Sequence, residues 1–341
     1  MPAETILVTG ASGFIAKHLV LKLLKAGYAV RGTLRRLERG GEVADAVRPH
    51  LTDPAALDRL SFAQADLEAD TGWPQAMAGV AAVIHTASPF PIAAPKDERA
   101  LIRPAVEGTL RVLKAAHAAG VNRVVLTSSS VAVLGVDLPA GRTAYDESMW
   151  TDIARPGTSA YAKSKTLAER AAWDFALANG LALTTINPSL VAGPPLDQHY
   201  GSSVSVIARI LRGKDPAVPR FGLPVVDVRD VAEAHLRALQ TPASIGQRII
   251  AAEESLWFQQ IAQTLKQAYP KRRIATMHAP MLALRLLALF DRDIRSILPS
   301  IGQNPQISNQ RACSLLGMTF IPARAAILAT AKVLIASGRF D

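Results

Sequence analysis

Short apolar runs alternate with longer stretches in which apolar residues recur every three or four positions, through the first half of the chain. The short runs have the length and β-branched content of buried strands, and the longer stretches have the periodicity of amphipathic helices. Strands are predicted at residues 5–9, 29–34, 61–65, 82–86, 123–127 and 182–186. Helices are predicted at residues 14–26, 97–119 and 159–179. This alternation predicts an α/β fold in which helices cover a parallel sheet.

A glycine-rich turn lies between the first predicted strand and the first predicted helix, with Ala16 at the place of the usual third glycine. The backbone of such a turn can approach a pyrophosphate closely, and the helix N-terminus supplies unpaired N–H groups. An ordinary turn is the alternative interpretation, but strand, turn and helix in this order favour a Rossmann-type, doubly wound sheet. The predicted contacts of the turn with a dinucleotide are Gly10, Ser12, Gly13, Phe14 and Ile15.

Arg35 and Arg36 directly follow the second predicted strand, and no acidic residue comes before Glu38. NAD-specific sites normally have an Asp or Glu there, which accepts hydrogen bonds from the ribose. Guanidinium groups instead match a 2′-phosphate bidentately, so the pattern favours NADPH; two solvated arginines are the alternative. Further cofactor contacts are predicted after the third and fourth strands, at the adenine and the ribose respectively: Asp66 and Leu67, and Thr86, Ala87 and Ser88.

After Asn187 the alternation gives way to a stretch rich in Pro and Gly, then a predicted helix at 203–212 and a strand at 224–228. The chain is therefore expected to leave the sheet, return to it and leave it again. We predict an NADP-binding Rossmann domain of residues 1–188 plus about 223–252. A smaller, discontinuous C-terminal substrate lobe is predicted from about 189–222 plus 253–341.

Composition and charge limit the partners of the protein. The residues are 49% apolar and 19% charged, which is typical of a globular protein. The formal net charge of +10 is spread over scattered Lys and Arg, so we expect a phosphorylated ligand and no nucleic acid. Cys313 is the only cysteine, which suits a reducing compartment. The seven histidines show no metal-ligand spacing, so no metal is expected.

No pattern for secretion or membrane insertion stands out. The chain begins directly with an apolar strand rather than with a basic segment and a long apolar run. The most apolar later stretch, 279–290, is interrupted by Arg285 and is too short to span a bilayer, so it is predicted as a lobe helix packed on one face. A soluble, cytoplasmic protein with no membrane partner is expected.

Three residues predict the chemistry. Tyr161 and Lys165 stand four residues apart near the start of a predicted helix, and therefore lie on one face. A tyrosine can protonate a forming alkoxide if its pKa falls, which a nearby ammonium group and a nicotinamide cation can cause. Ser129 ends the fifth strand, where its hydroxyl can bind a substrate carbonyl. Tyr-x-x-x-Lys alone is common on surfaces, but serine, tyrosine and lysine downstream of a dinucleotide turn predict a catalytic set.

The chain resembles the extended short-chain dehydrogenases/reductases over essentially its whole length. Within that family it is most similar to the branch of dihydroflavonol reductases and cinnamoyl-CoA reductases, together with fungal and bacterial carbonyl or aldehyde reductases. The matching text is Gly10-Ala-Ser-Gly-Phe-Ile15, Thr127-Ser-Ser129, Tyr161-x-x-Ser-Lys165-Thr-Leu-Ala-Glu-Arg-Ala-Ala-Trp173, Asn187-Pro188 through Gly193-Pro194, and Val226-Asp-Val-Arg-Asp-Val-Ala-Glu-Ala-His235.

The resemblance implies roles for single residues. Ser129 is the hydrogen-bond donor to the carbonyl, Tyr161 the acid and Lys165 its partner, while Arg35 grips the 2′-phosphate. It also implies contacts with the nicotinamide and the pyrophosphate, from Pro188, Ser189 and Leu190 and from Ser203 respectively.

The sequence departs from the family pattern at two positions. Leu134 stands where dihydroflavonol reductases carry an asparagine that reads flavonoid hydroxyls, so a flavonoid substrate is not expected. Ala105 stands where many extended members have an asparagine, so a side-chain proton relay is not expected there.

The predicted function is reduction of a small aldehyde or ketone by NADPH. The substrate pocket should lie over the nicotinamide, with the walls Phe90, Pro91, Val131, Leu134 and Tyr200. Phe90 and Leu134 are equally consistent with core positions. Apolar walls suit an aromatic or aliphatic carbonyl. The resemblance also implies a homodimer through helices 97–119 and 159–179.

Three other functions stay open. A nucleotide-sugar epimerase or dehydratase has the same triad but holds NAD tightly, and Arg35 argues against it. A 3β-hydroxysteroid-type dehydrogenase would run in the oxidative direction, which a sequence does not determine. A non-enzymatic, NADP-binding redox sensor has no need of a complete set of serine, tyrosine and lysine.

Overall fold

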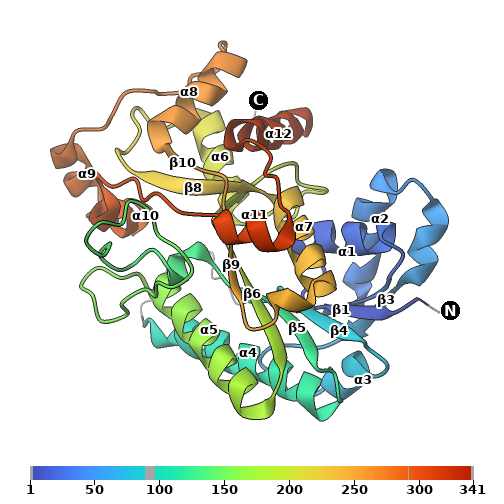
Figure 1. Ribbon diagram of the computed structural model, residues 1–341. Coiled ribbons are helices and arrows are strands. Elements are labelled where there is room, and N and C mark those ends of the chain that lie inside the picture. The colour runs from blue at the N-terminus through green and yellow to red at the C-terminus, as the bar shows by residue number, and fades with distance from the viewer. Residues whose placement is uncertain (1–2, 89–96, 291, 339–341) are drawn as a thin grey trace.

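A seven-stranded parallel sheet forms the centre of the protein (Figure 1). The computed structural model describes residues 3–88, 97–290 and 292–338. The strand order β3-β2-β1-β4-β5-β6-β9 reverses direction between β1 and β4, which confirms the predicted Rossmann-type, doubly wound fold. The strands are β1 (Thr5–Val8), β2 (Ala29–Leu34), β3 (Leu60–Gln64), β4 (Ala82–His85), β5 (Arg123–Thr127), β6 (Ala182–Pro188) and β9 (Arg248–Ala251).

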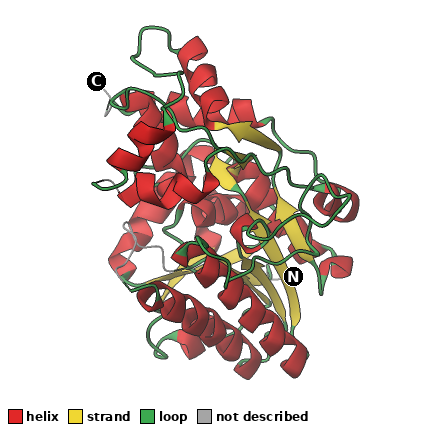
Figure 2. Cartoon of the chain, turned by 90° about the vertical axis from the view of Figure 1, so that its left-hand side faces the viewer, coloured by secondary structure: helices red, strands yellow, loops and turns green. Residues whose placement is uncertain are grey.

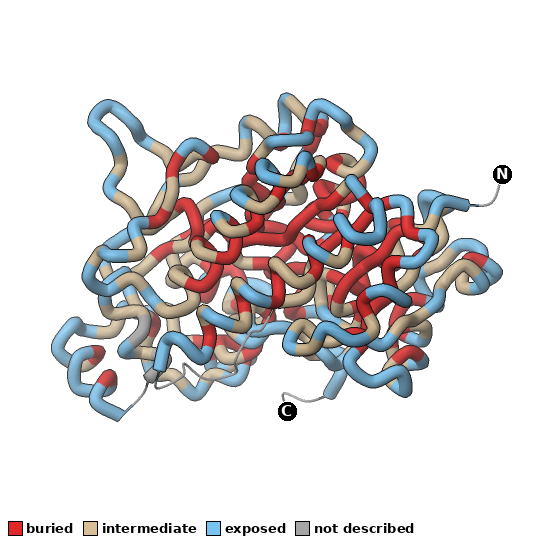
Figure 3. The backbone as a smooth tube through the Cα atoms, turned by 90° about the horizontal axis from the view of Figure 1, so that it is seen from below, coloured by how far each residue is buried: buried red, intermediate tan, exposed pale blue. Residues whose placement is uncertain are grey.

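Helices cover both faces of this sheet, and buried segments run through its centre (Figures 2 and 3). Successive residues of a strand point to opposite faces, so Ile6 and Val8 join one core cluster and Leu7 another. On the Ile6 face lie α1 (Phe14–Lys25), α2 (Gly40–Val47), α7 (Val228–Gln240) and α11 (Gln310–Leu316). On the Leu7 face lie α3 (Trp73–Met77), α4 (Arg99–Ala118) and α5 (Ala160–Asn179).

A second, three-stranded sheet stands beside the first, in the order β10-β8-β7. Its strands are β7 (Leu190–Ala192), β8 (Gly222–Asp227) and β10 (Glu254–Trp257). The prediction that the strand at 224–228 returns to the large sheet is wrong, because β8 pairs with β7 and β10. The place next to β6 is taken by β9, with Thr185 opposite Arg248. The division into two domains stays a prediction.

In the described part of the chain, five helices belong to the segments around the small sheet (Figure 1). They are α6 (Ser202–Arg212), α8 (Phe258–Ala268), α9 (Met281–Leu287), α10 (Arg292–Ile297) and α12 (Ala323–Ala336). The apolar stretch 279–290 contains α9, which buries Leu284 and leaves Leu282 71% exposed, and Phe290, just after the helix, is 89% exposed. The helix therefore packs through one face, as predicted, and its other apolar side chains are in contact with solvent. Within the described residues, every helix is too short or too polar to cross a membrane.

Candidate active site at the carboxyl edge of the sheet

The carboxyl ends of the parallel strands bring the predicted site residues to one edge of the large sheet. Ligands of doubly wound sheets bind at this edge, where the strand order reverses. At this edge, Gly10, Arg35, Asp66, Thr86 and Ser129 come shortly after β1, β2, β3, β4 and β5, and Pro188 is the last residue of β6.

The glycine-rich turn fits tightly between β2 and β4. Gly10 has a φ of 65°, and a Cβ atom there would lie 3.0 Å from that of Ala87. A Cβ atom on Gly32 of β2 would lie only 2.6 Å from that of Ala11. No side chain caps the N-terminus of α1, so the first N–H groups of this helix, from Phe14 onward, are left for a ligand.

Thr9 fastens the turn to the end of β4. Its Oγ1 accepts the N–H groups of Thr86 (3.1 Å) and Ala87 (3.0 Å). The hydroxyl proton of Thr9 is therefore donated to Nδ1 of His85 (2.7 Å). Burial lowers the pKa of His85 to about 3, so this histidine is neutral and serves as an acceptor that holds Thr9. The sequence predicted the place of Thr86 and Ala87 but missed this role of His85.

Arg35 and Arg36 lie exposed after β2. Within residues 3–88, 97–290 and 292–338, neither guanidinium group has a hydrogen bond or ion pair. In contrast, Arg31 donates to the main-chain oxygens of Ala76 (3.0 Å) and Ala78 (2.6 Å). Both arginines that the sequence predicted at the 2′-phosphate are therefore available to a ligand.

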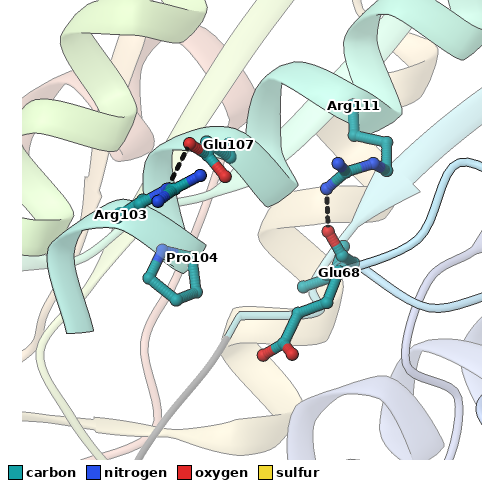
Figure 4. A pocket seen from close by; sticks show the side chains of 6 residues that line it. Glu68, Arg103, Pro104, Glu107 and Arg111 are labelled. Atoms are coloured by element: carbon teal, nitrogen blue, oxygen red, sulfur yellow. Dashed lines mark hydrogen bonds and ion pairs between the residues drawn. The ribbon is translucent and has the colours of Figure 1, made fainter. Parts of the chain in front are cut away.

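A cavity of about 190 Å³ adjoins the predicted adenine contacts Asp66 and Leu67 (Figure 4). Its lining is Leu67, Glu68, Arg103, Pro104, Glu107 and Arg111. Arg103 pairs with Glu107 at 2.7 Å, and Arg111 donates to the main-chain oxygen of Leu67 and to Asp70. Protein acceptors therefore already engage both arginines, and Leu67 and Pro104 add apolar surface to the lining.

The helix α5 positions two members of the catalytic set. It starts at Ser159, whose Oγ accepts the N–H of Ala162 (3.1 Å), and Tyr161 and Lys165 follow one turn apart. The side chain of Ser129 lies next to the hydroxyl of Tyr161, where it acts to lower the pKa of the phenol. Ser129 is 8% exposed and Lys165 is 9% exposed. The structure thus brings the serine and the tyrosine into contact and places the lysine one turn further along.

The charge states of this set follow from burial. Burial lowers the pKa of Lys165 to about 8, and the nearby carboxylate of Glu169 acts in the opposite direction. Burial raises the pKa of Tyr161, and the hydrogen bond with Ser129 acts in the opposite direction. The sequence analysis required a lowered pKa of Tyr161, and the protein alone does not provide it. At neutral pH Tyr161 is a protonated phenol, which is the form that can donate a proton.

A small cavity of about 10 Å³ lies against Lys165, close to the volume of one water molecule. Its lining is Ala87, Ser88, Thr109, Leu126, Thr127, Ser128, Lys165, Ala168 and Glu169. The predicted residues Ala87 and Ser88 thus share a cavity with the catalytic lysine. Ala105 is buried, and the polar side chain that α4 contributes to this cavity is Thr109.

The remaining predicted cofactor residues lie where β6 leads into the small sheet. The main-chain oxygen of Pro188 lies 3.5 Å from the hydroxyl of Ser129. The N–H of Ser189 donates to Ala251 (3.1 Å), and Leu190 packs against the core of the small sheet. Ser203 is half-buried in the first turn of α6.

Three of the five residues predicted to line the substrate pocket lie in the described part of the chain. Val131 and Leu134 are half-buried and follow directly after Ser129. Tyr200 packs against the core of the small sheet. Phe90 and Pro91 lie outside the described residues.

Sequence reasoning missed the buried carboxylate of Glu169. It accepts hydrogen bonds from Ser128, Asn187 and Arg248, at 2.5, 2.8 and 2.7 Å. The signal was its place four residues after Lys165, on the same face of the helix. Among the described residues, no group of three or more His, Cys, Asp or Glu side chains could hold a metal ion.

The chain matches known proteins over this whole site. The model of the NAD dependent epimerase/dehydratase family matches residues 6–251. Cinnamoyl-CoA reductase 1 of Petunia hybrida is 34% identical over 334 residues, which are 97% of this chain and 92% of that protein. Tetraketide alpha-pyrone reductase 1 of Arabidopsis thaliana is 38% identical over 272 residues, which are 78% and 81% of the two chains.

A solved structure adds to these sequence matches. The crystal structure of the yeast methylglyoxal/isovaleraldehyde reductase Gre2, complexed with NADPH, has a TM-score of 0.78 and 28% identity. The match covers 98% of this chain and 99% of that one. Together, these findings confirm the resemblance to extended short-chain dehydrogenases/reductases that the motifs predicted.

Proposed function

Because the chain belongs to the NAD dependent epimerase/dehydratase family, we propose that it is an oxidoreductase that reduces a small aldehyde or ketone to the alcohol with NADPH. The observation that carries this proposal is the placement of Ser129 next to Tyr161 at the carboxyl edge of the sheet, with Lys165 one turn further along α5. The similar plant proteins are named as reductases, and the yeast structure contains NADPH, which supports the same direction and cofactor.

The residues present fit NADPH. The space that a Cβ atom on Gly10 would fill is the close approach that a pyrophosphate requires, and α1 begins there without a cap. Arg35 and Arg36 would hold the 2′-phosphate, and Lys165 the nicotinamide ribose. When bound, the cofactor supplies the hydride for the carbonyl carbon.

The chain's own residues handle the oxygen and the proton. The hydroxyls of Ser129 and Tyr161 donate hydrogen bonds to the substrate carbonyl oxygen, which polarises the C=O bond. Tyr161 then gives its proton to the oxygen as negative charge develops there. The ammonium group of Lys165 stabilises the tyrosinate that remains, until solvent returns a proton to it.

The half-buried Val131 and Leu134 next to Ser129 support an aromatic or aliphatic carbonyl as the substrate. Arg35 disfavours a nucleotide-sugar epimerase, because such enzymes hold NAD tightly and this arginine suits the 2′-phosphate of NADPH instead. We also propose a homodimer through α4 and α5, where Leu177 of α5 is 88% exposed.

The test follows NADPH and, separately, NADH consumption by the purified protein. The substrates are a panel of aromatic aldehydes, α-ketoesters, diketones and a dihydroflavonol, and the readout is absorbance at the nicotinamide band. We expect turnover with NADPH, little with NADH, and none with the dihydroflavonol. Tyr161→Phe should bind NADPH as before and lose about 10²- to 10⁴-fold in turnover.

Two results would contradict the proposal. Cofactor binding without turnover of any carbonyl would favour an epimerase, an oxidative dehydrogenase or a redox sensor. Undiminished turnover by Tyr161→Phe would show that this hydroxyl is not the acid.

A further inference from the structure

The side chain of Glu169, in the middle of α5, is buried and ionic, and it is fully engaged. The residue is 1% exposed. Its carboxylate accepts hydrogen bonds from Ser128 Oγ (2.5 Å), Thr185 Oγ1 (3.0 Å), Asn187 Nδ2 (2.8 Å) and Arg248 Nε (2.7 Å). A buried charge is tolerated only when it is paired and hydrogen-bonded, and these donors from β6, β9 and the end of β5 meet that condition.

Arg248, the cationic partner, is held just as firmly. Its guanidinium group donates to the main-chain oxygens of Glu147 (2.9 Å) and Met149 (2.6 Å). It also lies 3.6 Å from the centre of the Trp150 ring. The orientation of the ion pair is therefore fixed from several sides, and the carboxylate has a defined position behind the catalytic set.

Two links join Glu169 to the catalytic set. The amide of Asn187 donates to the carboxylate and also, at 3.2 Å, to the main-chain oxygen of Ser129. Glu169 stands one turn after Lys165, and both side chains line the cavity of about 10 Å³. The two side chains thus face the same small cavity, close enough for the carboxylate to raise the pKa of the lysine.

We propose that Glu169 is a positioning residue that keeps Lys165 in its ammonium form and, through Asn187, orients the main chain of Ser129. This inference rests on the proposed function. The other ionisable groups around Lys165 in the described chain are Tyr161 on its own helix and His85 on β4. Both are neutral at pH 7, so Glu169, although it is ion-paired with Arg248, is the anion that raises the pKa of the buried lysine.

The test is the pH dependence of kcat/KM for the best carbonyl substrate, at saturating NADPH. Glu169→Gln removes the charge and keeps the size of the side chain. The alkaline limb of the pH profile reports the titration of Tyr161 and Lys165 together. In this variant the limb should move down by about one pH unit. Activity at pH 9 then falls about tenfold, while activity at pH 6 changes little.

Two further variants separate charge from structure. Glu169→Asp keeps the charge and should return the alkaline limb toward the wild-type pH. Thr185→Val removes one hydrogen bond to the same carboxylate, so it should lower the melting temperature and leave the limb in place. If Glu169→Gln does not fold, Glu169→Gln/Arg248→Met removes both buried charges, and its limb should move in the same direction by a smaller amount.

The inference is overturned if the limb of the glutamine variant stays in place while its melting temperature falls. It is also overturned if Thr185→Val moves the limb as far as the glutamine variant does. A wild-type protein without turnover would instead reject the proposed function, so the two failures are distinguishable.

Discussion

Replacing Gly32 with alanine should push the phosphate-binding turn out of place. Gly32 lies in β2, and its φ is not in the left-handed region, so the backbone itself accepts alanine. The new Cβ atom would stand 2.6 Å from that of Ala11, whereas ordinary contact begins at 3.4 Å, so one of them must retreat by 0.8 Å. The strain is therefore steric, and it falls mainly on the turn, since the next nearest atoms, in the ring of Phe62, lie at 3.0 and 3.1 Å.

The turn cannot yield freely. The N–H of Ala11 donates to the Thr33 oxygen, and the N–H of Gly10 donates to Thr33 Oγ1, both at 3.0 Å. Overpacking of this kind lowers the free energy of unfolding by about 1–3 kcal/mol. NADPH can bind only after the displaced turn returns to its place. If this costs about 1.4 kcal/mol, the dissociation constant of NADPH rises about tenfold.

Urea denaturation measures the stability of Gly32→Ala, and a fluorescence titration with NADPH measures its affinity. The matched control is Gly41→Ala in α2, where a Cβ atom meets nothing within 4 Å. We expect this control to gain about 0.4–1 kcal/mol and to bind NADPH unchanged. Wild-type stability and affinity in Gly32→Ala would refute the steric argument.

Two further predictions concern charge. Arg35→Leu should reduce the preference for NADPH over NADH about tenfold or more, because a charged hydrogen bond contributes about 1.5–3 kcal/mol; titrations with both cofactors measure the ratio. Arg103→Leu, an exposed arginine paired with Glu107, is the control, and an unchanged ratio in Arg35→Leu would place the 2′-phosphate elsewhere. Burial raises the pKa of Asp230 to about 6, so its proton stabilises the native state at acidic pH, and this contribution is lost as the pH rises through 6. Asp230→Asn can accept the same hydrogen bond from Ile321 and should be more stable by about 1–3 kcal/mol at pH 7 but not at pH 4, as urea denaturation at both values will show. A less stable variant at pH 7 would contradict this account.

The order of the elements could be predicted because local signals and burial agree. The strand at Ile6 is apolar on both faces, a glycine turn follows it, and Ser159 caps the helix that carries Tyr161. The pairing of β8 with β10 could not be predicted, because strand partners are chosen by tertiary packing rather than by local pattern.

The ion pair between Glu169 and Arg248 could not be predicted from the sequence either, because it also depends on tertiary packing. Charged residues in a helix are expected at the surface, and Glu169 is buried only because Arg248, 79 residues later in the chain, meets it. The motif that pointed to Lys165 contained Glu169, but the sequence alone assigned it no partner.

The path of the chain between its two sheets restricts how this protein can be engineered. From β6 in the large sheet the chain passes to β7 and β8 in the small one, returns through β9, and leaves again for β10. No single cut therefore separates the sheets. A chimera that borrows the substrate side of a relative must graft at least two segments at once, and a truncation before β9 would remove a strand from the large sheet as well.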